Sequence, residues 1–217
     1  GTKFEVLKSQ FIWSKVSLNR GLFPTAGQSQ AFALQLAIPG SSITYAKATY
    51  RHKYFKPLFG GKIIFSVRGE IGILEPYGDT NIAPFFEHFY AGGISSVRGF
   101  KQNTLGPRAT PSLYYVGSDG QPILDEEGNP VANPYAYYDN DRSIGGAYLV
   151  EAGFDLIFKL PFIEDQRSMR TSLFVDIGNV FSKDCGDKSI NINCSELDLG
   201  ELRYSIGVGG TWITQLG

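Results

Sequence analysis

The chain has 217 residues, and its charges nearly cancel, with 20 Lys and Arg against 21 Asp and Glu. This balance gives no basic footprint for nucleic acid, and the sequence lacks the run of about eighteen apolar residues that a transmembrane helix needs. With 26 Gly, 16 Phe and 12 Tyr against a single Met, the composition is rich in turn and strand formers, which predicts an all-β protein.

Residues 1–10 contain neither the apolar core nor the cleavage site of a signal peptide. We therefore expect either that the protein is not exported or that this sequence begins inside a longer precursor.

Alternation of apolar and polar residues runs through the chain and predicts strands. The expected strands are 11–18, 30–38, 42–55, 62–74, 143–159, 170–181 and 201–212. The strand 62–74 shows the pattern best, because Ile63, Phe65 and Val67 share a face opposite Arg68 and Glu70.

The predicted connections differ in length. Turns rich in Gly and Pro are expected at 19–27, 39–41, 56–61 and 161–166, and long loops at 76–142 and 182–200. Charged residues also occur along the middle of several long strands. Both features favour an antiparallel transmembrane β-barrel, although the short hairpin 39–41 falls on the side of the long loops. A soluble β-sandwich is the alternative.

The stretch FYAGGISSVRGFKQNTLGPR, residues 89–108, gathers four glycines around Arg98 and Phe100. Glycines let a backbone turn tightly while it presents a cation and a ring. Loops of this length in compact domains are usually functional or disordered, and we interpret this one as functional. The alternative is an exposed arginine in a glycine-rich turn.

Asp155 and Asp176 each lie in the middle of a predicted strand, on a face that is otherwise polar or small. A short turn joins the two strands, so they are expected to pair and to bring the carboxylates near one another. The planar guanidinium of Arg98 suits such a pair of acceptors. In the alternative, both carboxylates simply face water in a wide lumen.

Cys185 and Cys194 lie in one polar loop. A disulfide between them would close a loop of about ten residues, contribute roughly 2.5–3 kcal/mol on the chain-entropy model and imply an oxidising compartment. A metal site is not expected, because His52 and His88 are distant in sequence and two sulfurs do not complete a zinc shell.

The sequence contains no GxSxG, HExxH or glycine-rich phosphate-loop motif, and its two histidines show no partner pattern for acid–base work. We therefore expect neither an enzyme nor a cofactor.

Four segments resemble the barrel of the BamA family of outer-membrane assembly factors, which also includes TamA and the two-partner secretion transporters. The segments are RGLFPTAG (20–27), FYAGGISSVRGF (89–100), NTLGPR (103–108) and FVDIGNVF (174–181), in the same order along nearly the whole chain. The resemblance implies that the loop bearing Val97, Arg98, Gly99 and Phe100 folds into the lumen. There Arg98 would meet Asp155 and Asp176.

The chain departs from the family pattern in two places. Asp155 stands where the family has Glu, and this shorter carboxylate is expected to need a shifted loop or a water molecule. The pair Cys185 and Cys194 follows Phe181 instead of lying in the loop with Arg98.

The resemblance further implies that residues 1–217 form one partial outer-membrane barrel domain of the bacterial surface antigen type, with an extracellular loop at about 76–142. About seven strands would correspond to the second half of a barrel of about sixteen, without the final two. Such a sheet has two open edges, which we expect to close with further strands or with a second copy.

The function implied is the assembly and insertion of β-barrel proteins into the Gram-negative outer membrane, as the barrel of the central subunit of the assembly machine. The implied partners are the outer-membrane lipid bilayer, unfolded β-barrel clients and accessory lipoproteins. The alternatives are a polypeptide-secretion transporter of the same superfamily and a passive porin-like channel.

Overall fold

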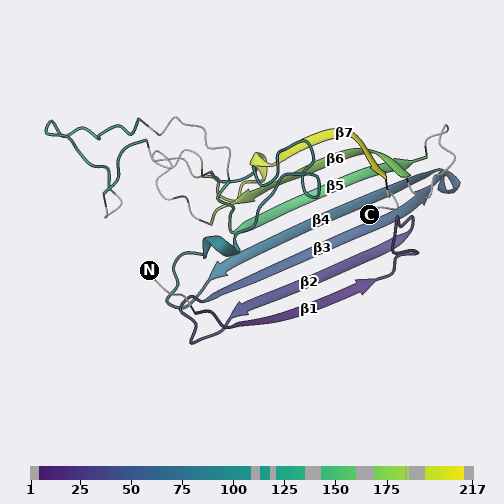
Figure 1. The fold of residues 1–217 in the computed structure, drawn as a ribbon, viewed down its shortest axis with the longest axis horizontal. Coiled ribbons are helices and arrows are strands. Elements are labelled where there is room, and N and C mark those ends of the chain that lie inside the picture. Colours follow the sequence, from purple (N-terminus) through teal and green to yellow (C-terminus); the bar gives the residue numbers. More distant parts are fainter. Residues whose placement is uncertain are drawn as a thin grey trace.

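The computed structural model describes residues 5–108, 113–117, 121–134, 143–159, 169–183, 185 and 194–212. Their strands form one antiparallel sheet in which each strand pairs with the next along the chain (Figure 1). The strands are β1 (Lys8–Val16), β2 (Gly27–Ala37), β3 (Tyr45–Leu58), β4 (Ile63–Pro76), β5 (Tyr148–Phe158), β6 (Met169–Phe181) and β7 (Arg203–Trp212). The predicted all-β fold and its seven strands are confirmed, with ends shifted by a few residues.

The order of strands places the connections at two ends of the sheet. Segments 38–44, 77–147 and 182–202 join strands at one end, called here the long-loop end. Segments 17–26, 59–62 and 159–168 join strands at the other, called the short-turn end. The short connection 38–44 therefore does lie beside the long loops, as its position in the sequence indicated.

One face of the sheet, called here the outer face, exposes a continuous set of apolar side chains. Successive residues of a strand point to opposite faces, so the alternation in sequence becomes a division between the two faces. The exposed outer-face residues include Phe11, Trp13, Ile71, Ile73, Phe154, Leu156, Leu173, Val175, Tyr204, Ile206, Val208 and Trp212. Such a surface is typical of the lipid-facing side of an outer-membrane sheet.

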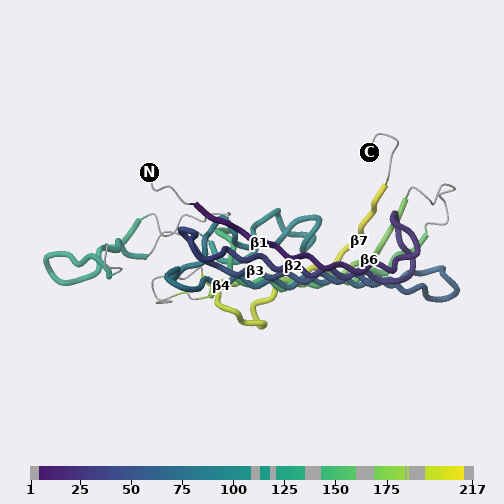
Figure 2. Tube along the Cα trace, turned by 90° about the horizontal axis from the view of Figure 1, so that it is seen from below, coloured from purple at the N-terminus to yellow at the C-terminus, as the bar shows by residue number. Residues whose placement is uncertain are grey.

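The opposite, inner face carries the polar side chains and is partly covered by the long connection between β4 and β5. Figure 2 shows the first part of this connection, in teal, on one side of the sheet. The buried apolar cluster lies between it and the strands at the long-loop end. Its members include Tyr45, Leu74, Phe89, Ala91, Val97, Leu105, Leu149 and Val180.

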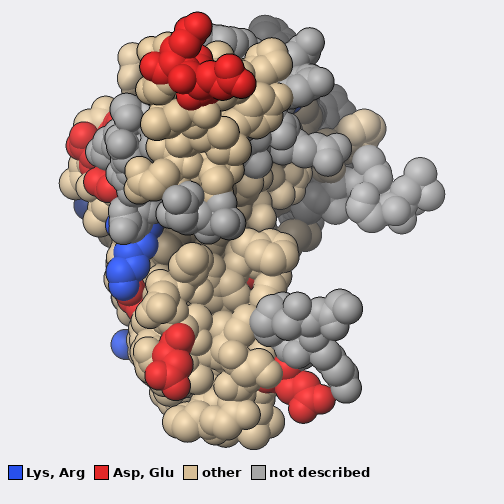
Figure 3. Space-filling view, turned by 90° about the vertical axis from the view of Figure 1, so that its left-hand side faces the viewer, with Lys and Arg blue, Asp and Glu red and all other residues tan. Residues whose placement is uncertain are grey.

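Residues 113–117 and 121–134 belong to a largely exposed excursion beyond this cover, seen at the left of Figure 1. Isolated bridges join Tyr114 to Ala132 and Leu124 to Pro130. The tip turns at Asp125, whose Oδ1 accepts hydrogen bonds from the backbone N–H groups of Glu127 at 3.0 Å and Asn129 at 2.8 Å. Figure 3, viewed from the side of the excursion, shows acidic side chains gathered on the surface. The described part of the excursion is therefore largely solvated.

The expected disulfide is present between Cys185 and Cys194, with Cα atoms 5.6 Å apart. It lies at the long-loop end in the connection between β6 and β7. Within the described ranges, the helical segments are short turns, and none has the length and hydropathy of a membrane-spanning helix.

Candidate functional site

Arg98 is anchored to two carboxylates on the inner face. Its Nε and Nη2 atoms donate to the two oxygens of Asp176 at 2.6 and 2.8 Å, and its backbone N–H donates to Asp176 Oδ2 at 3.0 Å. Its Nη1 donates to Asp155 Oδ1 at 2.9 Å. The structure therefore brings together the cation and both carboxylates singled out from the sequence, through a forked contact that only a planar guanidinium can make. The shorter Asp155 side chain is reached directly.

The pairing of β5 with β6 places the two carboxylates. Asp176 lies opposite Gly153, and Asp155 lies two residues further along β5, on the same face. Asp155 is itself opposite Phe174, whose ring centroid lies 3.7 Å from Arg98 Cζ. The Phe174 ring thus lies against the guanidinium of Arg98 while the carboxylates bind its N–H edge, which combines cation–π attraction with charge-assisted hydrogen bonds.

Arg68 on β4 is a second cation bound to Asp176, and the sequence did not single it out. Its Nη2 lies 2.7 Å from Asp176 Oδ1 and donates to the carbonyl oxygen of Ser96 at 2.8 Å. A Cβ atom at Gly153 would lie 2.2 Å from Arg68 Nε, so glycine at this position leaves the room that the ion pair occupies. The position of Arg68 on the polar face of β4 was the available signal, but its partner strand could not be assigned across the long loop.

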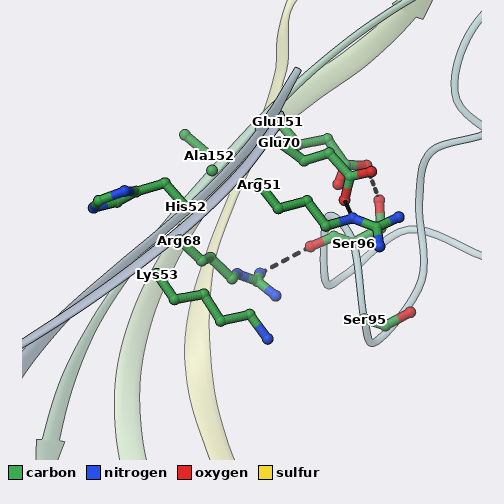
Figure 4. A pocket seen from close by; sticks show the side chains of 10 residues that line it. Arg51, His52, Lys53, Arg68, Glu70, Ser95, Ser96, Glu151 and Ala152 are labelled. Atoms are coloured by element: carbon green, nitrogen blue, oxygen red, sulfur yellow. Dashed lines mark hydrogen bonds and ion pairs between the residues drawn. The ribbon is translucent and has the colours of Figure 1, made fainter. Parts of the chain in front are cut away.

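Ser96 extends the same network toward Glu151. Its Oγ accepts from the backbone N–H of Gly92 at 2.8 Å and donates to Glu151. Figure 4 shows Arg68 and Glu151 reaching the Ser96 segment from neighbouring strands, beside a cavity of about 340 Å³. The loop is therefore fixed to β4 and β5 on the approach to Arg98.

The network is buried and balances its charges. The exposed fraction of the side chain is 0% for Asp176, 13% for Asp155 and 18% for Arg98. Burial alone would lower the pKa of Arg98, but hydrogen bonds to Asp176 and Asp155 raise this pKa above its ordinary value. Arg98 therefore keeps its charge, and each cation of the network neutralises carboxylate charge that water does not reach.

The other three residues of the VRGF motif fit the loop to the sheet. Val97 is buried against Gly178, where a Cβ atom would lie 3.0 Å from Val97 Cγ2. Gly99 has φ +87°, a left-handed conformation that favours glycine. Phe100 packs against the buried apolar cluster. The motif therefore supplies one cation, two apolar contacts and one turn.

Glu87 anchors the start of the loop at a second point, which the sequence analysis missed. Tyr45 donates to Glu87 Oε1 at 2.8 Å, Lys47 donates to the Glu87 backbone carbonyl at 2.6 Å, and Lys8 forms an ion pair with the carboxylate. These contacts tie the loop to β1 and β3, whereas Arg98 ties it to β5 and β6. No local pattern around Glu87 marked it, because its partners lie in distant strands.

We expect Glu87→Gln to flatten the loss of stability in acid. Burial raises the pKa of Glu87, but hydrogen bonds from Lys8 and Tyr45 outweigh burial and hold it below its ordinary value of 4.5. A depressed folded-state pKa contributes stability that is present above pH 4.5 and is lost as pH falls through the folded pKa. Urea unfolding from pH 6 to pH 3, about the range in which carboxylates titrate, measures this slope. An unchanged slope in the variant contradicts the assignment.

Comparison with known proteins identifies the family. Residues 2–217 match the model of the Omp85 superfamily domain. The chain belongs to the Omp85 superfamily. It is 32% identical over 219 residues to the outer membrane protein assembly factor BamA of Neisseria meningitidis serogroup B, covering 94% of the chain and 24% of BamA. The chain thus spans about a quarter of the length of this curated relative.

A solved structure supports the same conclusion. The chain matches the crystal structure of BamA from Haemophilus ducreyi lacking POTRA domains 1–3 with a TM-score of 0.77 and 30% identity, over 96% of this chain and 36% of that one. The predicted resemblance and fold are confirmed: the sheet corresponds to part of an Omp85 barrel, and the protein resides in the outer membrane. Omp85 assembly factors are not enzymes, in agreement with the sequence-based expectation.

Proposed function

We propose that this Omp85 chain forms part of the barrel of an assembly factor that inserts β-barrel proteins into the outer membrane, as the central subunit of the BAM complex. The similarity to BamA along nearly the whole chain supports this role. The observation that carries the proposal is the Arg98 network, because a passive channel has no need of a glycine-rich loop bound across its inner face.

Residues 1–217 would constitute a partial barrel domain of the bacterial surface antigen type. In this arrangement the long-loop end faces the cell exterior, with the extracellular loop at about 76–142, and the short-turn end faces the periplasm. The asymmetry between long and short connections supports this orientation.

The proposed activity has no chemical step. Unfolded β-barrel clients would gain backbone hydrogen bonds by adding strands at a seam of the complete barrel, with the lipid bilayer and accessory lipoproteins as further partners. Arg98 acts as an internal strut, because its bonds to Asp155 and Asp176 hold the loop on the inner face while other parts of the barrel move.

Insertion by the full-length protein in liposomes tests the proposal. We expect it to accelerate folding of an unfolded β-barrel client relative to empty liposomes, and Arg98→Ala to slow this reaction at least about tenfold, because a buried charge loses its partner. Lys53→Ala is the matched control, since Lys53 also lies on the inner face but has no ion pair among the described residues.

Other outcomes separate the alternatives. Absence of acceleration together with passage of one secreted polypeptide indicates a secretion transporter, and free passage of small solutes indicates a channel. An equal defect in Arg98→Ala and Lys53→Ala contradicts the strut.

A further inference from the structure

The turn between β1 and β2, residues 17–26, has a built internal structure. Asn19 Oδ1 accepts from the backbone N–H groups of Thr25 at 3.0 Å and Ala26 at 3.2 Å, and Asn19 Nδ2 donates to Thr25 Oγ1 at 2.7 Å. Gly27 has φ +100°, and a Cβ atom there would lie 2.0 Å from the carbonyl oxygen of Ser17. The RGLFPTAG motif (20–27) therefore encodes one defined turn. The role of the Arg98 network does not account for it.

Arg170, at the start of β6, contacts this turn although its strand is distant from β2 in the sheet. Its Nη2 donates to the carbonyl oxygen of Pro24 at 2.7 Å, and its Cζ lies 4.7 Å from the ring centroid of Phe23. Strands β3, β4 and β5 separate β2 from β6 in the sheet, so the contact crosses the inner face. The turn and Arg170 together fix the short-turn end of this face.

Four cations line the cavity beside this contact. It has a volume of about 250 Å³, and its basic lining residues are Arg20, Lys62, Lys159 and Arg170. No Asp or Glu is among the described residues that line it. The hydrogen-bond and ring partners of Arg170 are both neutral, and among the described residues the hydrogen-bond partner of Arg20 is the Thr25 hydroxyl, at 3.4 Å.

The contrast with Arg98 indicates what is missing. Arg98 meets two carboxylates, whereas none of the described residues that line this cavity is a carboxylate, and its four cations repel one another. Asp155 acts electrostatically on Arg170 from a neighbouring cavity, but it is already ion-paired with Arg98. A phosphate group would satisfy them better than a single carboxylate, because it offers several acceptor oxygens and carries one negative charge in a lipid diester and nearly two as free phosphate. We propose that the cavity at the short-turn end, lined by Arg20, Lys62, Lys159 and Arg170, binds a phosphate-class oxyanion.

Two sources offer this chemistry: free phosphate and the headgroup of an anionic phospholipid. The first arm of the test uses full-length protein in detergent, stripped of lipid, titrated calorimetrically with inorganic phosphate against chloride at equal ionic strength. The second uses the protein in liposomes of phosphatidylcholine, with or without phosphatidylglycerol, in a buffer free of phosphate, followed by mass spectrometry of the lipid retained after extraction into detergent.

We expect saturable binding in at least one arm. Arg170→Ala and Lys159→Ala should each weaken it at least about tenfold, the loss that follows removal of a hydrogen bond to a charged group. Lys53→Ala is the matched control, because Lys53 lies on the same face but does not line this cavity. Binding only to phosphate, or only to the lipid, assigns the source. If Arg170→Ala does not fold, Lys159→Ala gives the same test.

The segment 160–168 lies outside the described residues, and its sequence includes Glu164 and Asp165. The double variant Glu164→Gln/Asp165→Asn therefore forms a third arm. Tighter phosphate binding in this variant supports the site and identifies these carboxylates as competitors. Failure to bind either ligand, in both the wild type and this variant, overturns the proposal, as does binding that Arg170→Ala and Lys159→Ala leave unchanged.

Discussion

Asp176→Ala is expected to destabilise the folded protein by about 3–5 kcal/mol, the loss typical of breaking a buried ion pair. Asp176 is fully buried and accepts from two guanidinium groups, those of Arg98 and Arg68, and from one backbone N–H. Its removal leaves two cations near a site that water does not reach. Urea unfolding of the full-length protein in liposomes measures the change, and Asp79→Ala, which removes an exposed carboxylate, is the matched control.

A double-mutant cycle distinguishes direct pairing from general damage. Arg98→Ala alone is expected to be strongly destabilising, but in the Asp176→Ala background it should cost clearly less, because its main partner has already been removed. Strictly additive losses would contradict the pairing.

Reversal of both charges, Arg98→Asp with Asp176→Arg, is expected to restore stability only in part. The structure gives the reason. Arg68 Nη2 lies 2.7 Å from the Asp176 carboxylate. An arginine at position 176 would therefore attract the new carboxylate at position 98 but repel Arg68. Equal defects in the single and double variants would argue against direct contact between positions 98 and 176.

The strands were predictable because they depend on local regularities, whereas these regularities supplied only part of the Arg98 contact. They left open whether Asp155 and Asp176 simply face water, and it was the family resemblance that implied a contact with Arg98. A period of two residues assigns each side chain to a face, so Asp155 and Asp176 could be placed together as soon as β5 and β6 were expected to pair. The rich supply of glycine around Arg98 then indicated a loop able to approach them.

The remaining parts of the site depend on pairings between distant segments. Arg68 reaches Asp176 only because β4 pairs with β5 across the long loop, and Glu87 meets Lys8 and Tyr45 only because that loop crosses to β1 and β3. Sequence periodicity carries no information about such a path. The Asp155 side chain is likewise instructive: it was expected to need a shifted loop or a water molecule, yet Arg98 Nη1 reaches it at 2.9 Å.

Gly153→Val is expected to disrupt the network without removing any charged group. A Cβ atom at this position would lie 2.2 Å from Arg68 Nε and 2.8 Å from Asp176 Oδ1. Arg68 cannot simply move aside, since its guanidinium is held by both Asp176 and the Ser96 carbonyl oxygen. We expect a loss of about 3 kcal/mol, from overpacking together with the weakened ion pair.

Gly69→Ala is the matched control for this substitution. It also lies in the paired strands β4 and β5, but its added Cβ atom would meet only the carbonyl oxygen of Glu151, at an ordinary contact distance of 3.6 Å. Urea unfolding gives the stability of both variants, and limited proteolysis of the loop around Arg98 reports whether the loop has left the sheet. If Gly153→Val is as stable and as protected from proteolysis as Gly69→Ala, then Arg68 does not need the space that the absence of a side chain at position 153 leaves. Arg98 would then hold the loop without the help of Arg68.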